Sequence, residues 1–266
     1  MPSSSALARG SSGSHVQKAR VLPLLLLLLW TPFPVVDGKR RALRAGLRAP
    51  KEFDFYLLAT FWPAELCHRE TTNSCQYPQD WWKVNLTGHG LWPNNNDGTY
   101  PTSCGGAPFN DSIPEETIGM PIMTTYWPNF QYDVEDGEEL YDNLWEHEWN
   151  KHGTCTGLDQ YIYMTTTLAG IMNATPRLLS QTAAAAAAAP GSPSPSLPLL
   201  TLQNAFGGPT MAVLQCTSHK YLTGVFTCWS KNNETNLPYA RIPCPAAVLD
   251  EGTCQKGGDV VVPLFK

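Results

Sequence analysis

The stretch EHEWNKHGTC, residues 146–155, carries the most information about how this chain folds. At helical spacing, His147 lies beside Lys151, because residues four apart share one side of a helix. Glu148 lies beside His152 for the same reason. Two imidazoles, a carboxylate and an ammonium within six residues are a density that acid–base chemistry on a charged substrate requires. The stretch therefore predicts a helix with these groups in one polar sector.

Trp145 and Trp149 form another pair at this spacing, and their burial would turn the polar sector toward a cleft. A solvated charged face is the alternative, but such faces usually carry Glu–Lys pairs and rarely two histidines. His147-Glu148 also begins like a zincin signature. The residue four positions after His147 is Lys151, and a protonated lysine cannot bind zinc. We therefore expect no metal site.

A second stretch, GHGLWP at residues 88–93, supplies a third imidazole. The glycines on both sides of His89 allow close approach of backbone or ligand, and Trp92 gives an aromatic wall. In-line displacement at phosphorus needs one group that takes a proton and one that gives it. Imidazoles on two separate elements, with a nearby lysine and carboxylate for the developing charge, fit that chemistry.

The rest of the chain predicts alternating strands and helices. Apolar, β-prone runs predict strands at 53–62, 81–91, 211–216, 221–229 and 259–263. Helices are expected at 115–123, 161–173 and 136–152, the last with Leu140, Leu144 and Trp145 on its apolar side. Because βαβ periodicity is missing, we predict an α+β fold with a central antiparallel β-sheet packed against several α-helices. The alanine- and proline-rich run 183–198 is interpreted as an exposed low-complexity loop insertion.

The N-terminal region predicts passage through a secretory pathway. Basic residues precede a short apolar core, 21–30, so residues 1–38 are interpreted as a signal peptide, with an uncleaved signal anchor as the alternative. Residues 39–51 are basic and are expected to form a propeptide or a flexible arm. The catalytic domain is then 52–266. No other apolar stretch approaches the length of a membrane span, so none is expected after signal removal.

Eight cysteines follow the leader, which places an even number in a compartment that permits oxidation. Four disulfides are expected, and spacing alone leaves 105 connectivities open. The chain also contains four N-glycosylation sequons, which agree with the secretory route. They begin at Asn85, Asn110, Asn173 and Asn233.

From residue 52 onward the chain carries 9 Lys/Arg against 22 Asp/Glu, a balance of −13. A protein that wraps nucleic acid by bulk electrostatics has the opposite balance, so a polyanion must be held locally here. The five histidines of this region are expected to become charged near pH 5 and to soften the repulsion. An acidic working environment follows from this interpretation.

In both motifs the chain resembles the ribonuclease T2 family of secreted acid ribonucleases, which includes the plant S-like and self-incompatibility enzymes. The resemblance rests on HGLWP at 89–93 and HEWNKHGTC at 147–155, and extends over roughly 52–266. It implies roles for six residues: His89 as general acid, His152 as general base, Glu148 and Lys151 as stabilisers of the pentacovalent phosphorus, His147 as phosphate ligand, and Trp92 lining the site.

The resemblance also implies the disulfide pairing and the reaction. The pairs are Cys67–Cys75, Cys104–Cys155, Cys216–Cys254 and Cys228–Cys244. The implied reaction cleaves single-stranded RNA through a 2′,3′-cyclic phosphate to a 3′-phosphate end, without cofactor or metal. DNA, which lacks the 2′-hydroxyl, would not be cleaved. A monomer is expected, either secreted or in a vacuolar or lysosomal lumen.

Two positions depart from the family pattern. Phe61 stands where many members have a glutamine before Trp-Pro, and Leu144 replaces an aromatic residue of several plant members. Phenylalanine can stack on any base but cannot read its edge, so low base specificity is expected. The alternative from another class is a catalytically weak secreted protein that uses the same fold for RNA or nucleotide binding or for signalling.

Overall fold

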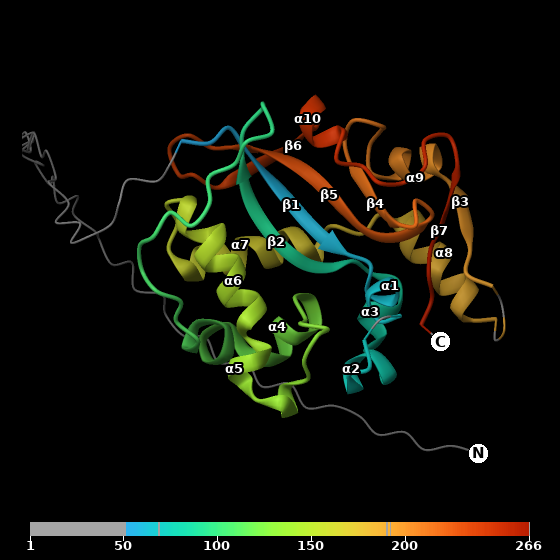
Figure 1. Cartoon of the computed structure of the whole chain (residues 1–266), viewed down its shortest axis with the longest axis horizontal. Helices are drawn as coiled ribbons and strands as arrows, with labels where there is room; N and C mark the ends of the chain where they lie inside the picture. Colours follow the sequence, from blue (N-terminus) through green and yellow to red (C-terminus); the bar gives the residue numbers. More distant parts are fainter. Residues whose placement is uncertain (1–51, 69, 190, 192, 266) are drawn as a thin grey trace, which may run out of the picture. The chain divides into compact units, whose positions relative to one another are not determined.

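Seven strands form one sheet in the computed structural model, which describes residues 52–68, 70–189, 191 and 193–265 (Figure 1). They are β1 (Phe55–Phe61), β2 (Thr87–Asn94), β3 (Ser196–Pro198), β4 (Val213–Thr217), β5 (Tyr221–Lys231), β6 (Pro238–Ile242) and β7 (Asp259–Val261). The order is β2-β1-β5-β7-β3, and β4 and β6 also pair with β5. The pairings are antiparallel as predicted, apart from a short parallel contact of β5 with β7.

The other regular elements of the described residues are helices. They are α1 (Pro63–Leu66), α2 (Asn73–Gln76), α3 (Asp80–Val84), π-helix η1 (Ile113–Gly119), α4 (Met120–Tyr126), η2 (Val134–Asp136), α5 (Glu138–Tyr141), α6 (Asn143–Lys151), η3 (Gly153–Cys155), α7 (Gln160–Met172), α8 (Arg177–Ala187), α9 (Leu199–Ala205) and α10 (Ala246–Leu249). Among the residues described, no helix is both long and apolar enough to cross a bilayer. The predicted signal peptide 1–38 and basic segment 39–51 lie outside these residues.

Strand β1 separates two parts of the core, because its side chains alternate between the faces of the sheet. Phe55 and Leu57 pack into a cluster with Val213 of β4. Tyr56 and Leu58 point to the opposite face, into a cluster of aromatic and apolar side chains from α4, α6 and α7. This second cluster holds α6 against the sheet, next to β2 (Figure 1).

The strand predicted at 81–91 is wrong in its first half. Residues 80–84 form α3, in which Asp80 and Lys83 make an i,i+3 ion pair. Trp82 is buried and its Nε1 donates a hydrogen bond to the carbonyl of Thr125. This contact with α4 overrides the β-propensity of the tryptophans. The strand starts at Thr87 and continues to Asn94, so His89 lies near its beginning.

The helix predicted at 136–152 is broken in two. Gly137 has a φ of 119° ahead of α5, and α6 begins only after Asp142. Because of this break, Leu140 is 45% exposed, so its predicted place on an apolar side is wrong. Trp145 is fully buried, as predicted. The helices expected at 115–123 and 161–173 are confirmed, the first as η1 followed by α4.

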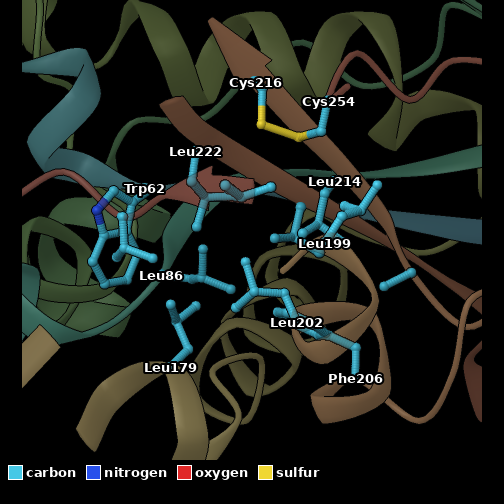
Figure 2. Close-up of a cluster of buried hydrophobic side chains, with 14 of the residues drawn as sticks. Trp62, Leu86, Leu179, Leu199, Leu202, Phe206, Leu214, Cys216, Leu222 and Cys254 are labelled. Atoms are coloured by element: carbon cyan, nitrogen blue, oxygen red, sulfur yellow. A yellow bond between two sulfur atoms is a disulfide. The ribbon is translucent and has the colours of Figure 1, made fainter. Parts of the chain in front are cut away.

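The exposed loop predicted at 183–198 is wrong in two parts. Residues 183–187 belong to α8, and Ser196–Pro198 form the edge strand β3, which pairs with β7. Leu179 and Ala183, one helical turn apart, are fully buried. Figure 2 shows Leu179 pointing into the same cluster as Trp62. The alanine run therefore packs on the core through one face, because alanine is both the best helix former and small.

Two strands, β3 and β6, were not predicted, since short edge segments containing proline give a weak strand pattern. The four disulfides implied by the family resemblance are all present: Cys67–Cys75, Cys104–Cys155, Cys216–Cys254 and Cys228–Cys244. The third of these lies at the edge of the cluster in Figure 2. The second joins the segment at the end of α6 to the loop after β2.

The packing of α8 gives a first test. We expect Ala183→Asp to lower the free energy of unfolding by about 3 kcal/mol, because it buries a carboxylate without a partner. Ala184→Asp is the matched control: the same change at an exposed position of the same helix should cost less than about 1 kcal/mol. Urea unfolding measures both. Equal losses in the two variants would contradict the burial of this face.

Candidate active site

The site lies where strand β2 meets helix α6. His89 and Trp92 come from β2, and Glu148 comes from the buried side of α6. Gly90 lies directly under the carboxyl group of Glu148, and a Cβ at this position would collide with it. The glycine after His89 is therefore required for the helix to approach the strand this closely. This contact brings the two motifs together.

The indole of Trp92 organises the site. Its Nε1 donates a hydrogen bond of 2.6 Å to Oε2 of Glu148. The ring of His152 stacks on it with centroids 5.0 Å apart, and the ring of His89 meets it edge-on at 4.9 Å. Phe61 stacks on His89 from the other side at 4.2 Å. Both predicted acid–base histidines thus touch the same indole ring.

The residues of the predicted polar sector at the end of α6 differ in burial. His147 is exposed and Lys151 is half-buried, whereas Glu148 and His152 are buried. His152 caps the helix, and a Cβ on the next residue, Gly153, would collide with the ring of Trp149. The four residues do gather at one place, where His147 and Lys151 line open pockets.

The loop opposite the end of α6 is held covalently. The Cys104–Cys155 disulfide joins the two segments, and the backbone N–H of Ser103 donates to the carbonyl of Lys151 over 2.9 Å. The aromatic ring of Tyr100, 49% exposed, lies 6.3 Å from the ring of His152. Tyr100 was not predicted as a site residue, because its loop has no helical or strand pattern that would place it near the motifs.

Glu148 is 1% exposed, and its Oε1 has no hydrogen-bond partner among the described residues. This oxygen lies 3.6 Å from Nε2 of His89. Burial raises the pKa of Glu148 to about 8, against the hydrogen bond from Trp92 and the charge of Lys151, which lower it. Below that pH the carboxyl is neutral and can donate a hydrogen bond to an anion.

The expectation that all histidines become charged near pH 5 is wrong for the two at the centre. Burial, with the nearby charges of His147 and Lys151, lowers the pKa of His89 to about 4. Burial and the same two residues, Lys151 first, lower the pKa of His152 to about 3. Both imidazoles are therefore neutral at pH 5 in the unliganded protein. His147 also has a lowered pKa, from burial and Lys151.

A pocket of about 400 Å³ opens beside His89. The predicted lining residues Phe61 and Leu144 both contribute to it. It is completed by residues that belong to neither motif: Leu66, Glu70, Pro128, Asn129, Phe130, Gln131 and Asn143. Most of them follow α4 in a segment without a chemical motif, so only the fold brings them here. A second open pocket, of about 420 Å³, shares Asn143 and His147 and reaches Lys151.

The four sequons differ in accessibility. Asn110, Asn173 and Asn233 are exposed. Asn85 is half-buried, and its amide group donates a hydrogen bond to the carbonyl of Trp81. The amide group of Asn173 likewise donates to the carbonyl of Ala169 (2.9 Å), so exposure alone distinguishes Asn85 from the other three asparagines.

Comparisons with known proteins identify the family of this chain. A model of the ribonuclease T2 family matches residues 53–239. Extracellular ribonuclease LE of Solanum lycopersicum is 40% identical over 111 residues, which cover 41% of this chain and 45% of that protein. Ribonuclease 1 of Arabidopsis thaliana is 38% identical over 122 residues, covering 44% and 50%. The chain therefore spans about half the length of the curated relatives it matches.

A solved structure shares the fold over a longer range. The RNase-related protein from Calystegia sepium aligns with a TM-score of 0.59 and 25% identity, and covers 81% of this chain and 100% of that chain. The α+β fold expected from the sequence is thereby confirmed.

The lowered histidine pKa values can be measured by NMR. In the free protein we expect the rings of His89 and His152 to titrate well below pH 6.5, as assigned by comparison with His89→Gln and His152→Gln. Inorganic phosphate should move at least one titration upward, because an adjacent anion stabilises the imidazolium. Titration of both rings near pH 6.5 without phosphate would contradict the desolvation described here.

Proposed function

Because the chain belongs to the ribonuclease T2 family, we propose that it is an endoribonuclease that cleaves single-stranded RNA without a metal ion or cofactor. The observation that carries the proposal is the contact of two imidazoles, His89 and His152, with the single indole ring of Trp92. Two proton-transfer groups fixed on one rigid support fit in-line attack at a phosphodiester.

In the first step His152 takes the proton from the ribose 2′-oxygen, which attacks the adjacent phosphorus. The O2′–P bond forms as the P–O5′ bond breaks, and protonated His89 gives its proton to the departing 5′-oxygen. This leaves a 2′,3′-cyclic phosphate. In the second step water opens the ring with the roles of the histidines reversed, and the product is a 3′-phosphate.

The surroundings of the two histidines support this division of roles. The pKa of His152 is lowered to about 3 and that of His89 to about 4, an order that favours His152 as the neutral base and His89 as the protonated acid. A bound phosphodiester, being an anion, raises the pKa of both rings and supplies the protonated acid at mildly acidic pH. We therefore propose an acidic optimum.

Three groups are proposed to stabilise the charge on the nonbridging oxygens. Neutral Glu148 offers a hydrogen bond from a buried carboxyl, and Lys151 adds a positive charge. His147 is exposed beside both pockets and is proposed to hold a phosphate. Because these groups lie at the site itself, they can hold an anionic substrate without a broad basic surface, although the chain is acidic overall.

Low base specificity is proposed from Phe61 and Leu144, an aromatic and an apolar residue that line part of the pocket beside His89. Phe61 stacks on the ring of His89, and its own ring carries no hydrogen-bonding group. Leu144 adds another apolar wall. Neither residue can distinguish the edges of the four bases.

The proposed protein is a secreted or vacuolar–lysosomal monomer. The leader 1–38 and the four disulfides support the secretory route, as does the name of the extracellular relative from Solanum lycopersicum. The sequons at Asn85, Asn110, Asn173 and Asn233 are proposed glycosylation sites, with residues 39–51 as propeptide or arm and 52–266 as the catalytic domain. DNA is not a substrate in this proposal, because it lacks the attacking 2′-hydroxyl.

Substitution of either histidine tests the roles directly. His89→Ala and His152→Ala should each lower kcat for RNA cleavage by about 10²–10⁴-fold, the usual contribution of a positioned acid or base. His219→Ala, on an exposed histidine bonded to Thr253, is the matched control and should retain activity. Circular dichroism checks folding. Near-normal cleavage by either site variant would overturn the assignment.

Product analysis tests the reaction itself. The purified protein, treated with EDTA, is incubated with a series of dinucleoside phosphates at pH 5 and pH 7.5. We expect 2′,3′-cyclic phosphates at both values, formed faster at pH 5, and similar rates across the series. Loss of activity that zinc restores would contradict the metal-independent mechanism. Nucleotide binding without any product would favour the binding or signalling alternative.

A further inference from the structure

Asp142, at the junction of α5 and α6, is an unusual buried carboxyl group. It is 4% exposed, and neither of its oxygens accepts a hydrogen bond from a donor among the described residues. It precedes α6 but does not cap the helix through its side chain. No cation forms an ion pair with it in that part of the chain. A buried carboxylate without a partner is costly, so something must neutralise it.

The groups that face Asp142 are themselves acidic. They are Glu115 of η1, Asp111 in the turn before η1, and Glu138 of α5. Within residues 52–265, apart from those left undescribed, no three acidic, histidine or cysteine side chains are placed to hold a metal ion. A proton is therefore the neutralising partner that this geometry admits. Burial, followed by the carboxyl of Glu115, raises the pKa of Asp142 to about 8.

We propose that Asp142 is a positioning residue: its carboxyl carries a proton, donates it in a hydrogen bond to Glu115, and so fastens η1 to the start of the catalytic helix α6. Loss of that proton as the pH rises places two carboxylates side by side and loosens the junction. The stability of this junction, which lies outside the proposed catalytic residues, therefore depends on pH.

The junction is connected to the pocket by its two neighbours in the chain. Asn129, which lines the pocket, donates through Nδ2 to the carbonyl of Tyr141 (2.9 Å) and to Oδ1 of Asn143 (3.0 Å). Its backbone N–H donates to the hydroxyl of Tyr141. Asn143 belongs to both pockets of the site. Movement at Asp142 therefore reaches the pocket wall through one residue on either side.

The test is the pH dependence of thermal stability in Asp142→Asn, whose amide can donate to Glu115 at every pH. A carboxyl whose pKa is raised on folding contributes stability that is full at low pH and is lost as the pH rises toward about 8. Relative to Asp142→Asn, the Tm of the wild-type protein should therefore fall by roughly 5 °C between pH 5 and pH 8. The pKa shifts of Glu148, His89 and His152 act in both proteins and cancel in this difference.

Glu116→Gln, at the exposed neighbour of Glu115, is the matched control and should follow the wild-type curve. Glu115→Gln should flatten the curve only in part, because it removes the second carboxylate while burial, the larger cause, still raises the pKa of Asp142. Parallel Tm curves for the wild type and Asp142→Asn would overturn the proposal.

A second measurement needs no variant. In wild-type protein labelled with ¹³C at the aspartate carboxyls, one resonance should titrate well above pH 5. If all aspartates titrate below pH 5, Asp142 does not carry the proposed proton, and the proposal is overturned. This label excludes Glu148, and neither it nor the Tm curves depend on activity, so failure of the proposed function leaves these results intact.

The effect on the site rests on the proposed ribonuclease function. Asp142→Asn should leave kcat at pH 5 near the wild-type value and reduce the rise in KM between pH 5 and pH 8 by about threefold. An unchanged ratio of KM values, together with the expected Tm curves, would confine the role of Asp142 to stability and overturn its role in positioning the pocket.

Discussion

The site depends on the hydrogen bond that joins the indole of Trp92 to the buried carboxyl of Glu148. This bond connects a strand to a helix at the point where Gly90 allows them to touch. Both histidines pack against this indole, so one contact positions His89, His152 and Glu148. Burial of the same carboxyl keeps it protonated. The same contact therefore determines both the positions of these residues and the protonation of the carboxyl group.

Local sequence patterns identify candidate residues of this site, but they do not show how deeply each residue is buried. Four-residue spacing relates His147 to Lys151 on any helix, so the sequence could place them. It could not say that Glu148 and His152 are buried while His147 is exposed and Lys151 half-buried. Burial decides the protonation state of an imidazole, and burial is a property of the whole fold. The expectation of charged histidines at pH 5 failed for that reason.

Long-range packing explains the other differences. Trp82 becomes part of a helix because α4 offers its indole a carbonyl, and no pattern in the strand-like segment announces this. The predicted helix starts only after Gly137, whose φ is 119°, and is interrupted at Asp142. The pocket residues after α4 share no motif, since they are brought together only when the helix packs. The chemistry near the motifs could be predicted from local spacing, whereas the boundaries of the site depend on tertiary contacts.

The alanine run at the end of α8 has a consequence for how this chain can vary. Within the run, Ala183 is fully buried, and the later alanines are exposed or half-buried up to the turn that leads to β3. Each added residue rotates the later part of a helix by about 100°, but beyond Ala183 the rotation affects only exposed or half-buried methyl groups and a connecting loop. Repeat expansion or contraction after Ala183 would thus leave the buried face of α8 in place. The same slippage before it would turn the buried face out of the core.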